Sequence, residues 1–240
     1  MELEGDWRRD GYVVARGVFD DATVQKLRVI AERCLVQHVA CNPEDGVPRS
    51  PEETLNHTCM RHLNHPGYCA PGSEEFTTLM ESIADPAVLS LVEGLFGGPC
   101  LFRSTSLFSN PLGTSTEGAW HRDSQFLIPD EADERQFIEE QVASKLTHSH
   151  GVQMQIALVP NDDVELVKGS HLRWDNEEEY AVRCADGRAH ATEPMPNSTR
   201  SESRLMARAR ALAPPLLCRP AASRPEDRHA SALLILSAPR

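Results

Sequence analysis

The feature that most constrains the fold is an alternating segment at residues 151–160, which reads GVQMQIALVP. Large apolar residues alternate there with glutamines, in the order Val152, Gln153, Met154 and Gln155. Successive side chains of a β-strand point to opposite faces, so this pattern predicts a strand with two different faces. Such a strand fits a sheet that packs a core on one side and presents polar groups on the other.

Helical patterns come before the strands. The segment 20–35 repeats apolar residues at helical spacing, and Asp20 or Asp21 is placed to cap it. A second helix is predicted over 85–97, where Asp85 supplies the cap and two glycines end the apolar stripe.

Strand-like segments follow the second helix, over residues 101–110, 119–128, 151–160 and 162–174. Residues 40–75 are rich in Pro, Asn, Gly and His, which predicts a loop. Helices first and strands after favour an α+β or mainly β domain that contains an antiparallel sheet or barrel.

Composition narrows the classes of partner and compartment. The formal net charge of −12 disfavours nucleic acid and anionic membranes as partners. No apolar run approaches the roughly 20 residues of a membrane span, and no secretory signal is visible at the N-terminus. Seven cysteines without a CxxC pair favour free thiols in a reducing cytosol over a disulfide framework. We therefore expect a cytoplasmic protein whose partners include neither nucleic acid nor a membrane.

The chemistry-bearing motif is His121-Arg122-Asp123. In an extended strand, residues two apart share a face, so His121 and Asp123 would project together while Arg122 points away. A second histidine would complete a 2-His-1-carboxylate triad, which leaves open coordination positions on Fe(II). The alternative from these residues alone is a surface His–Asp pair in a turn, with Trp120 packing in the core.

Three segments carry a resemblance to a known family. They read D-G-Y-V-V-x-x-G-V-F, W-H-R-D-S-Q-F, and V-Q-M-Q-I-A-L followed by D-D-V-E-L-V-K-G-S-H. In this order and spacing, over residues 7–180, the chain resembles the phytanoyl-CoA dioxygenase family of Fe(II)/2-oxoglutarate oxygenases, with Lys168 in place of the family's proline. The resemblance implies a double-stranded β-helix, a cupin-like jelly-roll, with flanking helices.

The resemblance also implies a cofactor set and a reaction. His121 and Asp123 stand where the family has its first two iron ligands, with 2-oxoglutarate as co-substrate and ascorbate as reductant. The implied reaction is hydroxylation of a C–H bond in a small organic molecule, and an aspartate at this place favours hydroxylation over halogenation. Gln125 and Gln155 are candidates for hydrogen bonds to the co-substrate, with amides satisfied in the core as the alternative.

The C-terminal part departs from the family pattern. In the family, a distal histidine follows the first pair by about 80–100 residues, and an arginine follows about ten residues later. The window 200–221 holds no histidine. His229 and Arg240 have the right mutual spacing, so they are the candidates for the third iron ligand and for the 2-oxoglutarate carboxylate.

Two regions are therefore expected: a jelly-roll domain with N-terminal helices over 1–200, and an atypical tail over 201–240. The tail holds nine Ala, seven Arg and five Pro but no Gly, a bias that favours a disordered or frameshifted end. In that case the jelly-roll would be incomplete. The alternative function is then a catalytically inactive relative that lacks the distal His and the 2-oxoglutarate Arg.

Overall fold

The computed structural model describes residues 1–40, 59–109, 120–143, 151–159, 164–188, 195–200, 208–212, 218–220 and 230–237. The helices are α1 (Trp7–Asp10), α2 (Asp21–Ala40), α4 (Glu74–Ile83), α5 (Pro86–Phe96), α6 (Glu131–Ala143) and α7 (Glu177–Arg188), with 3-10 turns η1 (Asp123–Phe126) and η2 (Ser170–Leu172). The strands are β1 (Glu2–Glu4), β2 (Tyr12–Arg16), β3 (Cys59–Arg61), β4 (Leu101–Ser109), β5 (Val152–Ala157), β6 (Val164–Val167), β7 (Ser198–Arg200), β8 (Arg208–Leu212), β9 (Cys218–Pro220) and β10 (Ala230–Ser237).

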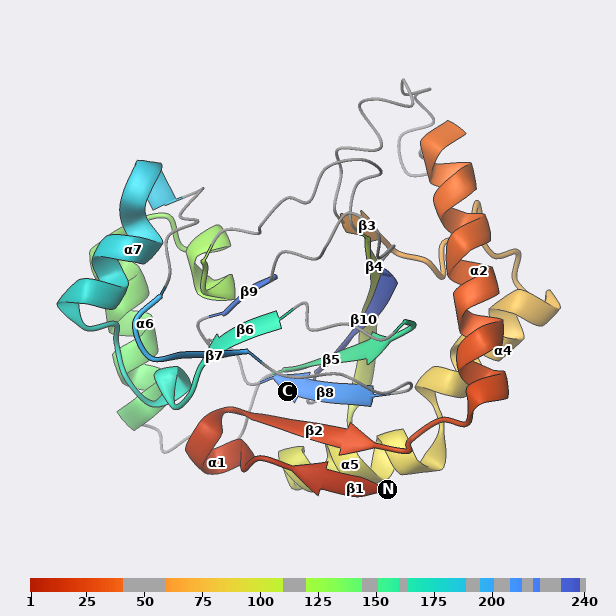
Figure 1. Ribbon diagram of the computed structural model, residues 1–240, viewed down its shortest axis with the longest axis horizontal. Coiled ribbons are helices and arrows are strands. Elements are labelled where there is room, and N and C mark those ends of the chain that lie inside the picture. The colour runs from red at the N-terminus through yellow and green to blue at the C-terminus, as the bar shows by residue number, and fades with distance from the viewer. Residues whose placement is uncertain are drawn as a thin grey trace.

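The described strands form two antiparallel sheets (Figure 1). The large sheet has the order β1-β2-β8-β5-β10-β4-β3, and the small sheet has the order β7-β6-β9. Several neighbouring strands are far apart in sequence, as in β2 beside β8 and β5 beside β10. A large and a small antiparallel sheet with such crossovers form a jelly-roll, as the resemblance implied.

The two faces of the large sheet have different coverings. Val13 and Ala15 of β2 and Met154 of β5 pack into the main core with side chains from α2, α4 and α5. These helices cover the outer face of the sheet (Figure 1). On the other face, Tyr12 and Val14 of β2 pack against Val164 and Leu166 of the small sheet. The second face therefore points into the space between the sheets.

The predicted two-faced strand is β5. Val152 and Met154 are fully buried on the helix-covered side, while Gln153 and Gln155 are only partly buried. Gln153 pairs across to Leu212, which in turn pairs with Tyr12 of the inner face. Directly opposed residues share a face of a sheet, so both glutamines lie on the inner face. The alternation prediction is confirmed.

Local capping signals also hold. The Asp20 carboxylate accepts a hydrogen bond from the Thr23 backbone N–H at 2.7 Å at the start of α2. Asp85 does the same for Ala87 N–H at 2.8 Å, and Gly97 ends α5 with a left-handed φ of 73°. Helix α4 starts within the predicted loop segment and is capped by Ser73. Neither α4 nor α7 was predicted from the sequence.

The strand predicted over 119–128 is wrong in the described residues from Trp120 onward. His121 makes a single bridge, and the chain then turns into η1. The Gln125 side-chain oxygen accepts the Arg122 N–H, and Leu127 N–H donates to the Ser124 carbonyl. Side chains that offer local acceptors compete with a sheet ladder, which accounts for the turn.

The expected incompleteness of the C-terminal part is not confirmed. Three strands described after residue 200 join the sheets: β8 and β10 in the large one, and β9 in the small one. The remaining residues of the tail lie outside the described ranges. No helix in the part of the chain that the structure describes combines the length and apolarity that a membrane crossing requires.

The packing of α5 on the large sheet gives a first prediction. Val88 on α5 is fully buried in the main core, whereas Val36 on α2 is 70% exposed. Val88→Ala removes buried methyl groups and leaves a cavity, so we expect it to lower the free energy of unfolding by about 2 kcal/mol. Val36→Ala is the matched control, since it is the same change on a helix surface, and should change stability by less than about 0.5 kcal/mol. Urea denaturation measures both, and equal losses would contradict this packing.

Candidate metal centre

The site begins with the two residues of the sequence motif. His121 and Asp123 both reach partly exposed positions, with 22% and 37% of their side chains accessible, and His121 Nε2 lies 3.6 Å from Asp123 Oδ1. The predicted strand is absent, yet the predicted convergence of the two groups is confirmed. The extended residue Arg122 followed by the 3-10 turn brings them to the same side.

The donor set fits a small divalent cation. Imidazole nitrogen and carboxylate oxygen lie about 2.0–2.2 Å from a metal such as zinc, and two such bonds together exceed the 3.6 Å that separates the donors. One ion can therefore contact both His121 and Asp123 without backbone movement. Nitrogen and carboxylate donors together also suit non-heme Fe(II).

Gln153 of β5 contacts this site from the opposite sheet. Its Nε2 donates to Oδ2 of Asp123, which leaves Oδ1 on the side of His121. A hydrogen bond to one oxygen of a ligating carboxylate fixes the orientation of the other. A contact with the co-substrate was predicted for Gln155 but not for Gln153, although their spacing of two on a strand puts both on one face.

The residue between the two candidate ligands is deeply anchored. Arg122 is 0% exposed, and its Nε donates to Asp175 Oδ1 at 2.9 Å. Its Nη1 and Nη2 donate to the carbonyls of Ser170 at 2.9 Å and Arg173 at 3.3 Å. The guanidinium thus ties the motif to the chain that follows β6, and its direction away from the site is as predicted.

A second buried arginine completes the network. Arg183 of α7 donates through Nε to Asp175 Oδ2 at 2.6 Å, and its Nη1 lies 3.2 Å from Glu134 Oε2. Glu134 also accepts from Ser124 Oγ at 2.7 Å. Two guanidinium groups therefore face two carboxylates, so the formal charges of the buried cluster balance.

Burial lowers the pKa of both arginines, but the net shift of the pKa differs between them. Burial lowers the pKa of the Arg122 guanidinium, and Asp175 opposes this. Burial acts the same way on Arg183, but Asp175 and Glu134 outweigh it and raise its pKa. Arginine starts from a pKa above 12, so both groups stay charged.

Gln125, a candidate for the co-substrate, is engaged in this network. Its Oε1 accepts from the Arg122 N–H at 3.2 Å and from Arg183 Nη1 at 2.9 Å. These contacts give it a structural role, and its contact with a co-substrate stays a prediction. Gln155 lies on the inner face beside Gln153, where the same prediction stands.

Apolar groups surround the motif on both sides. Trp120 is fully buried against Val167 and Met195, in agreement with the core-packing interpretation. Phe126 and Leu127, just after Asp123, are 68% and 78% exposed. The centroids of the Phe126 and His121 rings are 5.2 Å apart, so an apolar surface flanks the candidate ligands.

The third ligand and the carboxylate anchor are not placed. His229 and Arg240 lie outside the described residues. Among the residues that the structure does describe, no three His, Cys, Asp or Glu side chains gather as a metal site. His171 is 1% exposed, with Nε2 at 3.2 Å from the Arg8 carbonyl, and burial lowers its pKa, so it has a structural role.

Comparison with known proteins identifies the class of fold. EctD from S. alaskensis, crystallised with 2-oxoglutarate and 5-hydroxyectoine, superposes with a TM-score of 0.66 at 16% identity, over 97% of this chain and 73% of that one. AviO1 from Streptomyces viridochromogenes Tue57 gives 0.63 at 18%, over 97% and 92%. SnoN, a non-heme alpha-ketoglutarate-dependent epimerase, gives 0.61 at 20%, over 96% and 77%. At such identities these likenesses establish the shared fold.

The family assignment rests on a sequence model. The model of the phytanoyl-CoA dioxygenase family matches residues 7–208, most of the chain, so the protein belongs to that family. The resemblance stated from the three motifs is thereby confirmed. Among functionally curated proteins, no sequence matches this chain.

The buried network gives a second prediction. Asp175→Asn removes the charge that Arg122 and Arg183 share, so we expect the free energy of unfolding to fall by about 3–5 kcal/mol. The control is Glu32→Gln in the exposed Arg28–Glu32 pair of α2, where the loss should stay below about 0.5 kcal/mol. Chemical denaturation of both variants decides the matter, and a loss of less than about 1 kcal/mol for Asp175→Asn would show that the network does not hold the site.

Proposed function

We propose that this protein is an Fe(II)/2-oxoglutarate-dependent dioxygenase that hydroxylates a small organic substrate. The observation that carries the proposal is the convergence of His121 and Asp123 at 3.6 Å beside the inner face of a jelly-roll. Membership of the phytanoyl-CoA dioxygenase family supports it. So do neighbours of the same fold crystallised with iron and with 2-oxoglutarate.

Each residue has a stated task in this proposal. His121 Nε2 and Asp123 Oδ1 bind the ferrous ion, and Gln153 holds the Asp123 carboxylate in place through Oδ2. Arg122 keeps the motif rigid by its contacts with Asp175. When bound, iron and 2-oxoglutarate supply the O2 activation that hydroxylation of a C–H bond needs. The exposed Phe126 lies beside His121, where it can contact the substrate.

The co-substrate contacts are part of the same proposal. Gln155 lies on the strand face that points between the sheets, which supports the proposal that its amide hydrogen-bonds a bound dicarboxylate. Arg240 is proposed to pair with the far carboxylate of 2-oxoglutarate, because a planar guanidinium binds a carboxylate through two hydrogen bonds. His229 is proposed as the third iron ligand.

The alternative is a catalytically inactive relative that lacks a third ligand. The comparisons do not favour it, since the family model matches the chain through both motif segments around His121 and Gln155. The inactive form and the active enzyme are distinguished by what the purified protein does in the absence of substrate. An intact site should bind iron and release succinate slowly from 2-oxoglutarate, whereas the inactive form should do neither.

The first functional prediction concerns the two residues that the structure brings together. His121→Ala and Asp123→Ala should each lower the affinity for Fe(II) by more than about 100-fold. The reason is that a residue bonded directly to the metal contributes at least as much to affinity as the groups that hydrogen-bond such a residue. Succinate release in the presence of Fe(II), ascorbate and 2-oxoglutarate should disappear in both variants. His62→Ala is the control, since His62 is an exposed histidine of another segment and should bind iron normally. Unchanged iron content in His121→Ala would refute the assignment.

The second functional prediction separates the active from the inactive form. His229→Ala should remove iron binding and succinate release if His229 is the third ligand, as proposed. His190→Ala, a change of the same kind in the polar segment 185–195, is the matched control and should leave both intact. Metal analysis and a succinate assay on the two variants measure this. A wild-type chain that binds no stoichiometric iron would instead identify the inactive form.

A further inference from the structure

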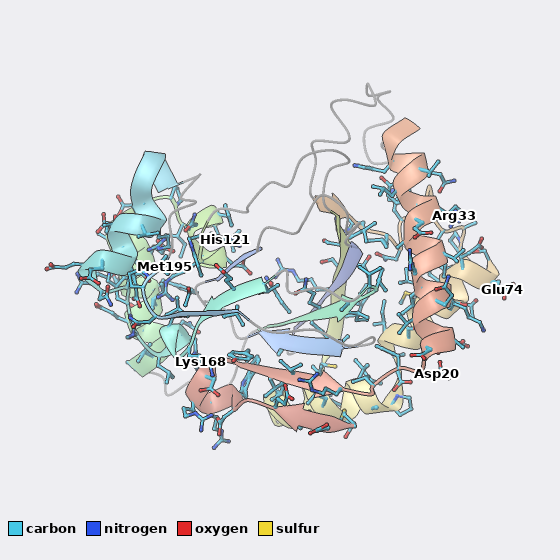
Figure 2. The ribbon with its side chains drawn as sticks, viewed as in Figure 1. Asp20, Arg33, Glu74, His121, Lys168 and Met195 are labelled. Carbon is cyan, nitrogen blue, oxygen red and sulfur yellow. The ribbon has the colours of Figure 1, made fainter. Side chains whose placement is uncertain are left out.

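Two cysteines from separate segments meet in the main core, away from the candidate metal centre. Cys34 lies on α2 and Cys69 in the connection between β3 and α4, 35 residues apart, with their Sγ atoms 3.7 Å from each other. Both residues are 0% exposed. Figure 2 shows neighbouring Arg33 on the side of the molecule opposite to His121.

Arg33 connects this thiol pair to the surface. Its Nη2 lies 3.5 Å from the Sγ of Cys69 and donates to the Tyr68 carbonyl at 2.8 Å. The Arg33 side chain is 35% exposed, and its Nε lies 3.6 Å from a Glu75 carboxylate that is also partly exposed. Arg33 therefore reaches from the Cys69 sulfur to a partly exposed position at the protein surface.

The two thiols are not equivalent. Arg33 Nη2 lies 3.5 Å from Cys69 Sγ and 3.8 Å from Cys34 Sγ, so its charge is nearer to Cys69. The hydrogen bond between the two thiols, together with the charge of Arg33, lowers the pKa of the Cys69 thiol to about 7, and the same hydrogen bond, with burial, raises the pKa of Cys34. A thiolate is the nucleophilic form of cysteine, so Cys69 is the more reactive sulfur of the pair. Cys100, whose pKa is raised by burial, shows the ordinary behaviour.

The segments that carry the pair are already fixed to each other. His38, one turn after Cys34 on α2, lies with Nδ1 at 2.6 Å from the Tyr68 hydroxyl. Arg33 binds the backbone of the same Tyr68. Two side chains of α2 thus hold the chain at Cys69, so the sulfurs would close from 3.7 Å to the roughly 2.05 Å of a disulfide between segments that are already packed together.

We propose that Cys34 and Cys69 form a reversible disulfide, with Cys69 as the sulfur that reacts with a small peroxide and Cys34 as the resolving thiol. This is an oxidation site separate from the proposed iron chemistry and independent of it. Formation of the bond ties α2 covalently to the segment before α4. Both helices cover the outer face of the large sheet, so the disulfide would link two parts of that helical layer covalently.

The chemistry balances with hydrogen peroxide as oxidant. The Cys69 thiolate attacks one peroxide oxygen, the O–O bond breaks, and hydroxide leaves to take up a proton as water, which gives a sulfenic acid. Cys34 then loses its proton as its sulfur attacks the sulfur of Cys69, the S–O bond breaks, and a second water leaves. Two thiols and one peroxide yield one disulfide and two waters, and a dithiol reductant reverses the change.

The test uses the full chain, reduced, desalted and then treated with hydrogen peroxide. After unfolding and alkylation, peptide mapping should show Cys34 and Cys69 joined, with the other cysteines alkylated. The melting temperature should rise by roughly 5–10 °C, because the bond closes a loop of about 35 residues, and should return after dithiothreitol. The proposal is overturned if both thiols remain open to alkylation, or if the bond joins different cysteines.

Single variants identify which sulfur reacts. In Cys34→Ser, peroxide should leave a sulfenic acid on Cys69 that dimedone traps, without a rise in melting temperature. In Cys69→Ser, Cys34 should stay unoxidised, and Cys100→Ser is the matched control that should form the bond as the wild type does. Dimedone on Cys34 would reverse the assignment. If a variant fails to fold, the wild-type peptide map still decides the matter.

The rate of oxidation should also depend on pH. Because only the thiolate reacts, the rate should rise about tenfold per unit below pH 7 and level off above it. The charged or titratable groups near the pair are Arg33 on α2, Glu75 on α4 and His38, which lies against Tyr68. Arg33→Gln should move the rise to higher pH, because the cation favours the thiolate; an unchanged profile would show that Arg33 does not activate Cys69.

Discussion

The ion pairs around Asp175 are the contacts on which the candidate centre depends. Within the described residues, the motif that carries His121 and Asp123 makes a single bridge, at His121, and it turns at once into a 3-10 helix. Such a segment would be free to shift if Arg122 between them were not buried and bonded to Asp175. Arg183 fixes Asp175 from α7, so the placement of the two candidate ligands is set by residues outside the candidate centre.

The centre is shared between the two sheets. Its histidine and aspartate come from the chain near the small sheet, where Trp120 packs against Val167 of β6. The group that orients the aspartate, Gln153, comes from the large sheet. The polar face of β5 therefore does more than contact solvent, because it supplies amides to the space where the cation would lie. A jelly-roll permits this because its two sheets face each other over a narrow interior.

The sequence predicted what depends on local order and missed what depends on distant partners. Alternation gave β5 and its inner face, and the Asp85 and Gly97 signals gave the ends of α5. The proximity of His121 and Asp123 followed from a spacing of two, although by a different backbone path. No sequence pattern near Arg122 indicates that its carboxylate partner, Asp175, lies 53 residues later. In the same way no local pattern pairs two cysteines 35 residues apart.

The C-terminal residues matter for the same structural reason. Strand β10 lies between β4 and β5, paired along nearly its whole length on both sides. Without it the large sheet would divide into β1-β2-β8-β5 and β4-β3, and the strand that carries Gln153 would have an open edge. The apolar run at 232–237 of the compositionally biased tail supplies most of this central strand. Residues beyond the family match at 208 thus complete the sheet on which the proposed site is built, whichever residue provides its third ligand.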